Sequence, residues 1–324
     1  MTTIKIIAGR EVAALVTIAD LIEPMRAALI AYSTGGVHRH PRVTAALDGD
    51  DQMLIMPAAV DQAAGLKILT MFPGAVAHGL PSVQGLVVLI DGVTGEPRAV
   101  LDGTTVTELR TGAVSALATD RLARPDARTL ALIGSGVQGR AHLRALAEIR
   151  PWTEVRVYGR TRESADRLAE SARGLALPAR STATVAEAVA GADVICTTTS
   201  ACAPVLDDAD VSPGAHVTAV GAFGATCREL PSALVARAAL FADSRSAVLS
   251  EAGDFLLPQK EGVLPAPQIT ELGTVLAGES PGRTSPSEIT VLKSLGLPIE
   301  DVVACDLVYR RALDADAGQD VDLA

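Results

Sequence analysis

Aromatic side chains are scarce in this chain: Phe, Tyr and Trp make up 2% of its 324 residues, although hydrophobic residues make up 48%. The core must therefore be built from Ala, Val, Leu and Ile. Blocks of Lys and Arg are also missing and the net charge is -10, which argues against binding to nucleic acid. There is no signal-peptide pattern and no apolar run of membrane-helix length. We expect a cytoplasmic protein that binds neither nucleic acid nor membrane.

Cysteine and histidine are few and scattered, which predicts no metal site. The cysteines show no CxxC pair, so reduced and mostly buried thiols are expected at Cys196, Cys202, Cys227 and Cys305. Surface or structural roles are expected for the separated histidines His38, His40, His78 and His216.

The stretch from Thr129 to Gly139 is the most informative in the chain, because an apolar strand there enters a Gly-x-Gly-x-x-Gly turn that leads into a helix. Gly134 permits the tight turn, Gly136 lets the backbone approach a pyrophosphate, and Gly139 lets the helix pack closely. The helix N-terminus then presents N–H groups and a positive dipole end to the phosphates. The sequence therefore predicts a dinucleotide site here.

From this turn onward, strands and helices alternate, which predicts a Rossmann-type, doubly wound parallel sheet within an α/β fold. The expected strands are 130–133, 154–158, 194–198, 216–220 and 239–242, and the expected helices are 139–149, 163–172 and 185–190. Residues 277–287 are expected to form a surface loop, and 299–315 a final helix.

The preceding region has a different pattern, which predicts a separate α+β domain. Helical spacing over 11–31 is followed by short strand-like runs and then by a helix that starts near Thr105; the runs are 43–47, 53–56, 65–70, 86–90 and 98–101. We expect a substrate-binding domain at 1–122, completed by a C-terminal helix in 303–324. The dinucleotide domain is expected at 123–302.

The second strand of the dinucleotide unit indicates which cofactor is bound. In NAD-binding proteins its tip carries an acidic residue that holds the ribose 2′-hydroxyl. Here the tip lacks Asp and Glu, and Arg160 and Arg162 could bind a 2′-phosphate, with Thr161 as a hydroxyl donor. This pattern favours NADPH, with NADH as the alternative; the competing interpretation is a pair of solvated loop arginines.

Three basic residues of the first domain could form an anion site. Arg42 precedes an expected strand, Lys67 lies inside an apolar strand, and Arg110 is early in the helix near Thr105. Arginines can hold a carboxylate while the lysine transfers a proton, and crowding would lower the pKa of Lys67 from about 10.4. The alternatives are an edge lysine in water and surface salt bridges. Asp301 and Asp306, on the final helix, are expected to be solvated.

Over nearly its whole length the chain resembles the ornithine cyclodeaminase/μ-crystallin family. The motifs that carry the resemblance are Pro41-Arg42, Ile55-Met56-Pro57, Gly65-Leu66-Lys67, Pro81-Ser82-Val83-Gln84-Gly85, Glu108-Leu109-Arg110-Thr111, Ile133-Gly134-Ser135-Gly136-Val137-Gln138 and Lys293-Ser294-Leu295-Gly296. The resemblance implies a homodimer, a substrate carboxylate held by Arg42 and Arg110, and Lys67 as the acid–base residue. It also implies that the cofactor is surrounded by Ser82, Thr111, Val137, Gln138, Thr199, Val220, Gly221 and Ser294.

Two departures from the family pattern bear on the reaction. Ornithine-converting members carry Glu and Asp where this chain has Leu54 and Phe223, and Phe223 resembles members that reduce cyclic imino acids. We expect NADPH-dependent reduction of Δ1-pyrroline-2-carboxylate or Δ1-piperideine-2-carboxylate to L-proline or L-pipecolate. The alternatives are an amino-acid dehydrogenase, an ornithine cyclodeaminase-type deaminating lyase, a 3-hydroxyproline dehydratase and a non-catalytic nucleotide-binding protein.

Overall fold

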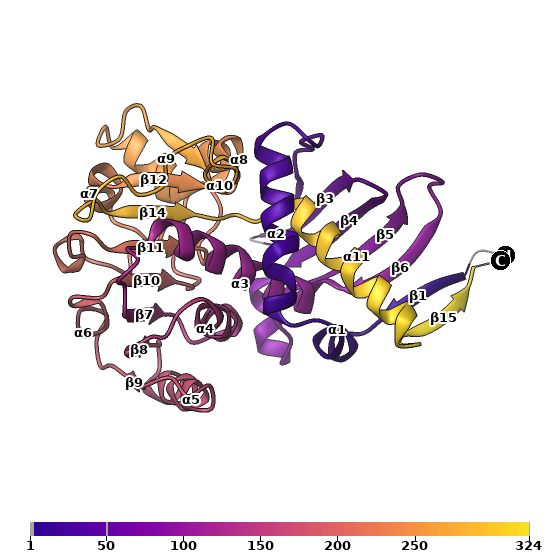
Figure 1. Ribbon diagram of the computed structural model, residues 1–324, viewed down its shortest axis with the longest axis horizontal. Coiled ribbons are helices and arrows are strands. Elements are labelled where there is room, and N and C mark those ends of the chain that lie inside the picture. Colours follow the sequence, from indigo (N-terminus) through magenta and orange to yellow (C-terminus); the bar gives the residue numbers. More distant parts are fainter. Residues whose placement is uncertain (1–2, 50, 324) are drawn as a thin grey trace. The chain divides into compact units, whose positions relative to one another are not determined.

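The chain divides into two units, and one helix contributes residues to both (Figure 1). The computed structural model describes residues 3–49 and 51–323. Unit 1 is Met1–Arg110 with Leu297–Ala324, and unit 2 is Thr111–Gly296. The first boundary lies inside α3 (Gly103–Leu122), because this unbroken helix supplies Arg110 to unit 1 and its later turns to unit 2. The sequence pattern placed the boundaries later, after residues 122 and 302.

Unit 1 is built on a seven-stranded sheet of order β15-β1-β6-β5-β4-β3-β2. Strands β2 to β6 form an antiparallel meander, β1 runs parallel to β6, and β15 pairs antiparallel with β1. The strands are β1 (Thr3–Ile7), β2 (Val43–Ala46), β3 (Gln52–Val60), β4 (Ala63–Met71), β5 (Val83–Asp91), β6 (Pro97–Asp102) and β15 (Gln319–Asp322). A short 3-10 helix, η1 (Pro73–His78), joins β4 to β5.

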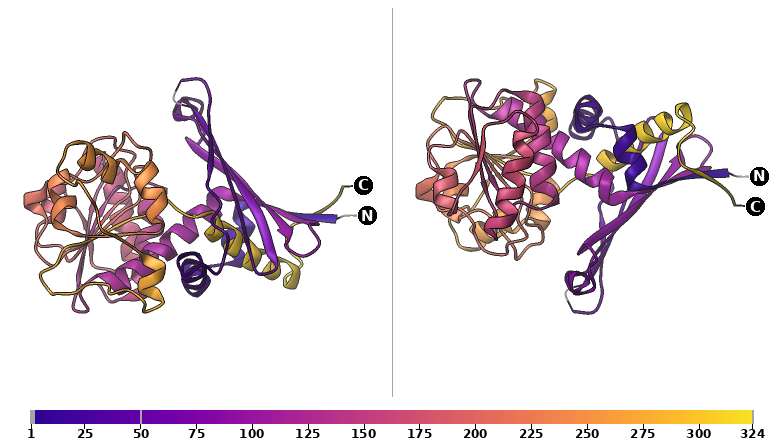
Figure 2. Two further views of the ribbon diagram at one scale, coloured as in Figure 1. Left: turned by 90° about the horizontal axis from the view of Figure 1, so that it is seen from above. Right: turned by 90° about the horizontal axis from the view of Figure 1, so that it is seen from below.

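One face of this sheet is covered by α2 (Ile18–Ser33) and the C-terminal helix α11 (Pro298–Asp314), as Figure 2 shows edge-on. Alternate strand residues such as Met56, Val87 and Leu101 are buried beneath these helices. Their neighbours point to the other face, where apolar side chains such as Leu86 stay partly exposed.

The expected helix over 11–31 is in fact two helices. α1 (Gly9–Leu15) ends before Thr17, whose hydroxyl accepts a hydrogen bond from the Asp20 amide and so caps α2. The final helix begins and ends within one residue of the expected range 299–315.

Unit 2 is a parallel sheet of eight strands in the order β13-β12-β14-β11-β10-β7-β8-β9, with helices on both faces, as the sequence predicted. The strands are β7 (Thr129–Ile133), β8 (Glu154–Tyr158), β9 (Ala179–Ser181), β10 (Val194–Thr197), β11 (His216–Ala219), β12 (Ala239–Ala242), β13 (Ile269–Glu271) and β14 (Thr290–Lys293). The helices are α4 (Val137–Ile149), α5 (Arg162–Arg173), α6 (Val185–Val189), α7 (Ser232–Arg237), α8 (Arg245–Glu251), α9 (Gly253–Lys260) and α10 (Leu272–Leu276), with the 3-10 turn η2 (Asp208–Asp210). Residues 277–287 form a loop, as expected.

The strand order reverses between β7 and β10, which places the ligand crevice of unit 2. In open parallel sheets, ligands bind outside the carboxyl ends of the strands at such a switch point. Here β7 ends in the Gly134 turn and β10 ends just before Thr199. The dinucleotide turn therefore occupies the position that this fold uses for binding.

The expectation of four reduced cysteines is wrong for one pair. Cys202 and Cys227 form a disulfide that joins the loops after β10 and β11, and Cys202 is exposed. Cys196 and Cys305 are buried free thiols. The bonded cysteines are 25 positions apart with β11 between them, so sequence spacing gave no sign that the two loops meet.

His216 is a structural histidine inside the sheet of unit 2. Its Nδ1 lies 2.9 Å from Thr290 Oγ1 and its Nε2 lies 2.9 Å from Thr218 Oγ1. Thr290 donates its own hydroxyl proton to Leu122 O, so it can only accept from the ring, and His216 is a neutral tautomer with its proton on Nδ1. Burial lowers the pKa of His216 to about 3.

This histidine makes the protein less stable in acid. The unfolded chain takes up a proton near pH 6.5 while the folded chain does not, so the free energy of unfolding falls as the pH falls between 6.5 and 3. His216 should account for about 2 kcal/mol of the loss between pH 7 and pH 5. Urea unfolding at the two pH values should therefore show a smaller loss in His216→Gln, whereas the exposed-site control His78→Gln should behave as wild type. An equal loss in His216→Gln would contradict this assignment.

Candidate functional site

Lys67 is a buried lysine in the middle of the unit 1 sheet. Strand β4 lies between β3 and β5, and Lys67 pairs with Met56 on one side and Val87 on the other. Those two residues are buried on the helix-covered face, and Lys67 shares that face with only 2% of its surface exposed. The alternative of an edge lysine in water is therefore wrong.

The partner of Lys67 comes from the opposite end of the chain. Asp301 Oδ2 lies 2.7 Å from Lys67 Nζ, and both side chains are buried. Asp301 begins the buried stripe of α11 at helical spacing, followed by Ala304, Cys305 and Val308. The expectation that Asp301 is solvated is wrong, because this residue lies on the apolar face of the helix.

Arg110 joins the same cluster from α3. Its Nε donates to Asp301 Oδ1 at 3.0 Å and its Nη1 donates to Glu300 Oε2 at 2.7 Å. Arg110 is 4% exposed, so these are buried ion pairs rather than the surface salt bridges of the alternative interpretation. We refer to Lys67, Arg110, Glu300 and Asp301 as the Lys67 cluster.

Burial and charge act against each other on the two central groups of this cluster. Burial lowers the pKa of Lys67 to about 8, with Asp301 opposing that effect and Arg110 adding to it. Burial would raise the pKa of Asp301, but Arg110 and Lys67 outweigh it and hold that pKa below its usual range. The amine thus titrates close to neutral pH, as a group that exchanges protons must.

Arg42 lies in the same cross-strand row as Lys67. Val43 of β2 pairs with Ile55, so continuing that register by one residue sets Arg42 opposite Met56, which pairs with Lys67. Side chains in one row point to one face of a sheet. Arg42 is half-buried at the start of the edge strand.

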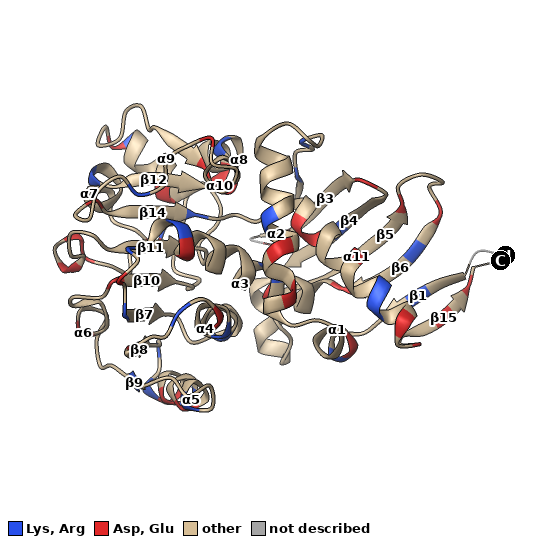
Figure 3. Cartoon of the chain, in the orientation of Figure 1, with Lys and Arg blue, Asp and Glu red and all other residues tan. Residues whose placement is uncertain are grey.

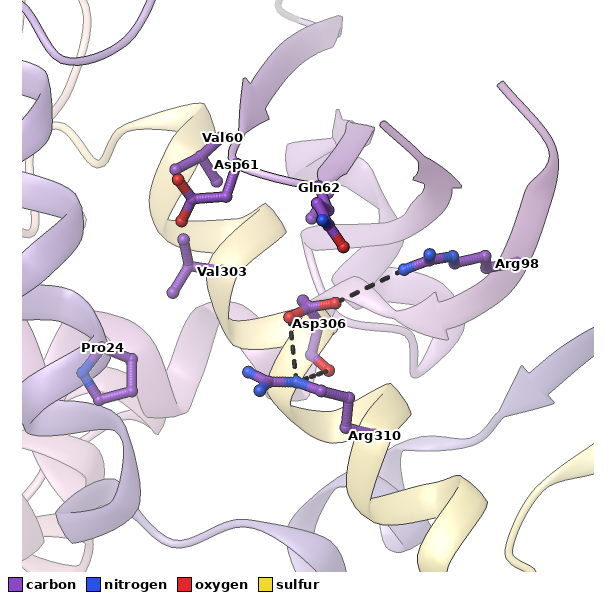
Figure 4. Close-up of a pocket in the computed structure, with 9 residues that line it drawn as sticks. Pro24, Val60, Asp61, Gln62, Arg98, Val303, Asp306 and Arg310 are labelled. Atoms are coloured by element: carbon purple, nitrogen blue, oxygen red, sulfur yellow. Dashed lines mark hydrogen bonds and ion pairs between the residues drawn. The ribbon is translucent and has the colours of Figure 1, made fainter. Parts of the chain in front are cut away.

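Unit 1 also contains a separate cavity of about 390 Å³, drawn in Figure 4. Arg98 and Arg310 both approach Asp306 there, at 3.9 Å and 3.1 Å. Asp306 is therefore ion-paired rather than simply solvated. These charges satisfy one another, so the cavity contributes nothing to the chemistry of the Lys67 cluster. Acidic and basic residues are interspersed along both units (Figure 3).

The dinucleotide turn of unit 2 has the backbone that its sequence predicts. Gly134 has φ +117°, which favours glycine, and its amide donates to Tyr158 O at the end of β8. A Cβ at Gly139 would lie 2.2 Å from Gly134 O, so only glycine allows α4 to start this close to the turn. A Cβ at Gly136 would meet nothing within 4 Å. Gly136 and the exposed Val137 thus open α4 toward solvent, which fits a pyrophosphate cradle.

The tip of β8 also fits the sequence reading. A Cβ at Gly159 would lie 2.4 Å from Ser135 Oγ, so no side chain occupies that place. Thr161 caps α5 by accepting from the Ser164 amide, and Arg162 pairs with Asp166 at 3.0 Å. Arg160 is exposed and makes no ion pair among residues 3–49 and 51–323. Both arginines are thus exposed near this tip, and Arg162 has an ion-pair partner.

A buried carboxylate, Glu229, holds the loops after β10 and β11. Its Oε1 accepts from the amide and hydroxyl of Thr199 at 2.7 and 2.8 Å, and its Oε2 accepts from the Gly221 and Ala222 amides. Thr199 and Gly221 were predicted as cofactor neighbours. The structure brings them together, although the Thr199 hydroxyl is directed to Glu229.

Two further buried carboxylates support the same edge of the sheet. Asp254 accepts from the Glu229 and Leu230 amides and lies 2.8 Å from Lys293 Nζ, which also donates to Ala222 O. Asp243 accepts from Ser294 Oγ at 2.9 Å, so this predicted cofactor residue already has a protein partner.

Of the remaining predicted cofactor residues, Val220 and Thr111 belong to unit 2, whereas Ser82 precedes β5 in unit 1. The amide of Val220 donates to Thr197 O, which sets it beside the end of β10. Thr111 is buried in α3.

Sequence reasoning missed the carboxylates that hold these loops and cations: Glu229, Asp243, Asp254, Glu300 and Asp301. The helical spacing of Asp301 with apolar residues was a usable signal. For the loop carboxylates no periodic pattern exists, because they bond to backbone amides of distant segments.

Comparison with known proteins now places the chain. The pattern of the ornithine cyclodeaminase/mu-crystallin family matches residues 4–316. The chain belongs to this family. The ketimine reductase mu-crystallin of Rattus norvegicus is 41% identical over 295 residues, which cover 89% of this chain and 91% of that protein.

Two solved structures have nearly the same fold. The Δ1-pyrroline-2-carboxylate reductase of Thermococcus litoralis, in complex with NADH and L-proline, has a TM-score of 0.94 and 32% identity, covering 98% of this chain and 100% of that one. An archaeal alanine dehydrogenase dimer with bound NAD has a TM-score of 0.95 and 30% identity, covering 100% of both chains.

Within the described residues, no helix is both long and apolar enough to cross a membrane, and no three potential metal ligands cluster.

The open space at Gly136 allows a direct test of the cradle. Gly136→Ala should fold normally and weaken nicotinamide dinucleotide binding about tenfold or more, since its methyl group would occupy space meant for the pyrophosphate and overpacking costs about 1–3 kcal/mol. Gly74→Ala, which also adds a Cβ in open space, is the matched control. Calorimetric titration measures both, and equal affinities in the two variants would reject the cradle.

Proposed function

We propose that this protein is an NADPH-dependent reductase of cyclic α-imino acids, with Δ1-pyrroline-2-carboxylate or Δ1-piperideine-2-carboxylate as substrate and L-proline or L-pipecolate as product. The observation that carries the proposal is the buried Lys67–Asp301 pair beside Arg110, in a chain of this family. The names of the reductases reported above support the same substrate class.

The residues of the Lys67 cluster suit this reaction. Arg110, with Arg42, holds the substrate carboxylate through a guanidinium fork and so fixes the ring. Lys67 gives a proton to the imine nitrogen, which makes C2 electrophilic. Solvent then returns a proton to the Lys67 side chain. A nicotinamide held at the Gly134 turn would supply the hydride for C2, and the C=N electron pair would then remain on nitrogen.

Residues at two other positions support reduction over deaminating cyclisation. Leu54 is 4% exposed on the same face of the sheet as Met56, so an apolar side chain occupies that position in unit 1. Phe223 follows β11 in unit 2 and is 38% exposed. Neither can hold the distal ammonium of ornithine or exchange a proton, which disfavours a lyase.

An amino-acid dehydrogenase is the second candidate. It would hold an open-chain imino acid through the same arginines, and the likeness to the archaeal alanine dehydrogenase favours it. Leu54 and Phe223 count against the ornithine cyclodeaminase-type lyase, and no observation favours the 3-hydroxyproline dehydratase.

A substrate panel separates these functions. We expect NADPH oxidation with Δ1-pyrroline-2-carboxylate, little with pyruvate and ammonia, and no ammonia release from ornithine. Lys67→Met should lower kcat about 10²- to 10⁴-fold while leaving NADPH binding intact, because it removes the proton donor. Lys260→Met, which changes an exposed lysine, is the control. Activity on pyruvate and ammonia alone would overturn the imine assignment, and near-normal turnover in Lys67→Met would remove Lys67 from the mechanism.

For the cofactor we propose NADPH in preference to NADH. Support comes from Arg160, which is exposed at the tip of β8, and from the tight fit around Gly159 that leaves no place for an acidic side chain. An Asp or Glu there would hold the 2′-hydroxyl of NADH and repel a phosphate.

Arg160→Ala tests this cofactor preference. Losing a charge-assisted hydrogen bond worth about 1.5–3 kcal/mol should raise the KM for NADPH by about 10- to 100-fold and leave that for NADH unchanged. Arg167→Ala, on the following helix α5 and paired with Glu163, should change neither value. Equal losses with both cofactors in Arg160→Ala would reject the preference.

The proposal extends to assembly and location. We propose that the partly exposed apolar face of the unit 1 sheet, which includes Leu86, packs on a second copy to form a homodimer; the alanine dehydrogenase dimer supports this. The cytoplasm is the proposed location, since NADPH is regenerated there.

A further inference from the structure

The Lys67 cluster assigns a role to a residue outside the substrate anchors. Asp301 contacts both cations: Oδ2 lies 2.7 Å from Lys67 Nζ and Oδ1 lies 3.0 Å from Arg110 Nε. We propose that Asp301 is a positioning residue that holds the Lys67 ammonium in place, and in its charged form, for proton transfer. This inference rests on the proposed function.

The geometry leaves Lys67 dependent on this contact. Its ammonium is 2% exposed, so water cannot solvate the charge. Besides Asp301, the Lys67 ammonium contacts Thr107 Oγ1 of α3, at 3.4 Å. A hydroxyl does not compensate a positive charge. Without Asp301 the amine would lose its proton or its orientation.

The other charged groups around Lys67 cannot substitute for Asp301. Arg110, on α3, opposes the Lys67 charge. Glu300 also raises the pKa of Lys67, but less than Asp301 does, and its 2.7 Å contact is with Arg110. Cys305, one turn along α11, is a buried thiol whose pKa burial raises, so it stays neutral. Arg42, in the row of Lys67 on the β2 side, is a further cation.

Asp301 also sets the direction in which Lys67 points. Lys67 stands on β4 and Arg110 on α3, so the Asp301 carboxylate on α11 fixes side chains from two other elements. A rigid arrangement of this kind reduces the cost of orienting the proton donor in each turnover.

The small number of lysines makes the proposal measurable without an activity assay. The chain has only Lys5, Lys67, Lys260 and Lys293, so protein labelled with ¹³C at lysine Cε gives four signals. The signal lost in Lys67→Met identifies Lys67, and its titration from pH 4 to pH 11 reports the charge of this amine directly.

Asp301→Asn should lower the Lys67 titration midpoint by about 1–3 units, the effect of removing an opposite charge at this distance. Glu300→Gln, the matched control, removes the neighbouring carboxylate that contacts Arg110, and should shift the midpoint much less. An unchanged midpoint in Asp301→Asn, or an equal shift in the two variants, overturns the proposal.

Kinetics then connect this charge to the reaction. The alkaline limb of the pH profile of kcat/KM should move to lower pH in Asp301→Asn, because Lys67 loses its proton earlier. A shifted midpoint with an unmoved limb overturns the role in catalysis. If the wild-type protein reduces no cyclic imine, the proposed function fails while the titration still decides the Lys67–Asp301 coupling.

Asp301→Glu provides a second variant if Asp301→Asn does not fold. It keeps the charge but displaces the carboxylate by one methylene, so kcat should fall with little change in KM, and the Lys67 midpoint should stay near that of the wild type. A wild-type kcat in folded Asp301→Glu would overturn the positioning role.

Discussion

Burying an ammonium and a guanidinium side by side is the constraint on which the rest of unit 1 depends. Each charge taken out of water costs several kcal/mol unless an opposite charge meets it, and two like charges also repel. Glu300 and Asp301 at the start of α11 meet that cost, with the two cations on β4 and α3. The C-terminal helix therefore completes the site as well as covering the sheet, which explains why Leu297–Ala324 belongs to unit 1 although 186 residues of unit 2 intervene.

Unit 2 also contains buried carboxylates, and there they hold loops in place. Its loops at the carboxyl ends of β10, β11 and β14 carry predicted cofactor residues, and loops are usually the mobile parts of a fold. Here Glu229 and Asp243 bind the backbone amides of these loops, while Lys293 and Asp254 form a buried pair beneath them. Such contacts fix the backbone without occupying the exposed side of the crevice. Preorganised loops of this kind suit a cofactor whose reactive atom must be held in one orientation.

Local sequence patterns were sufficient to predict much of this structure. The Gly134 turn, the alternation of strands and helices, and the strand that holds Lys67 all follow from residues close together in sequence. The carboxylate partner of Lys67 did not follow, because Asp301 lies 191 residues beyond Arg110 and a helical pattern does not tell which strand the helix covers. Asp301 was expected to be solvated because it is charged, and its position on the apolar face of the helix was overlooked. The Cys202–Cys227 bond was missed for a related reason, since only the parallel sheet brings those two loops together.

A crystal structure of the protein with NADP⁺ and L-proline tests the central claim most directly. The account predicts the proline carboxylate on the Arg110 guanidinium and the ring nitrogen within hydrogen-bonding distance of Lys67 Nζ, with Asp301 still in contact with that amine. Proline bound away from Lys67 and Arg110, with the ion pairs of the Lys67 cluster unchanged, would contradict it.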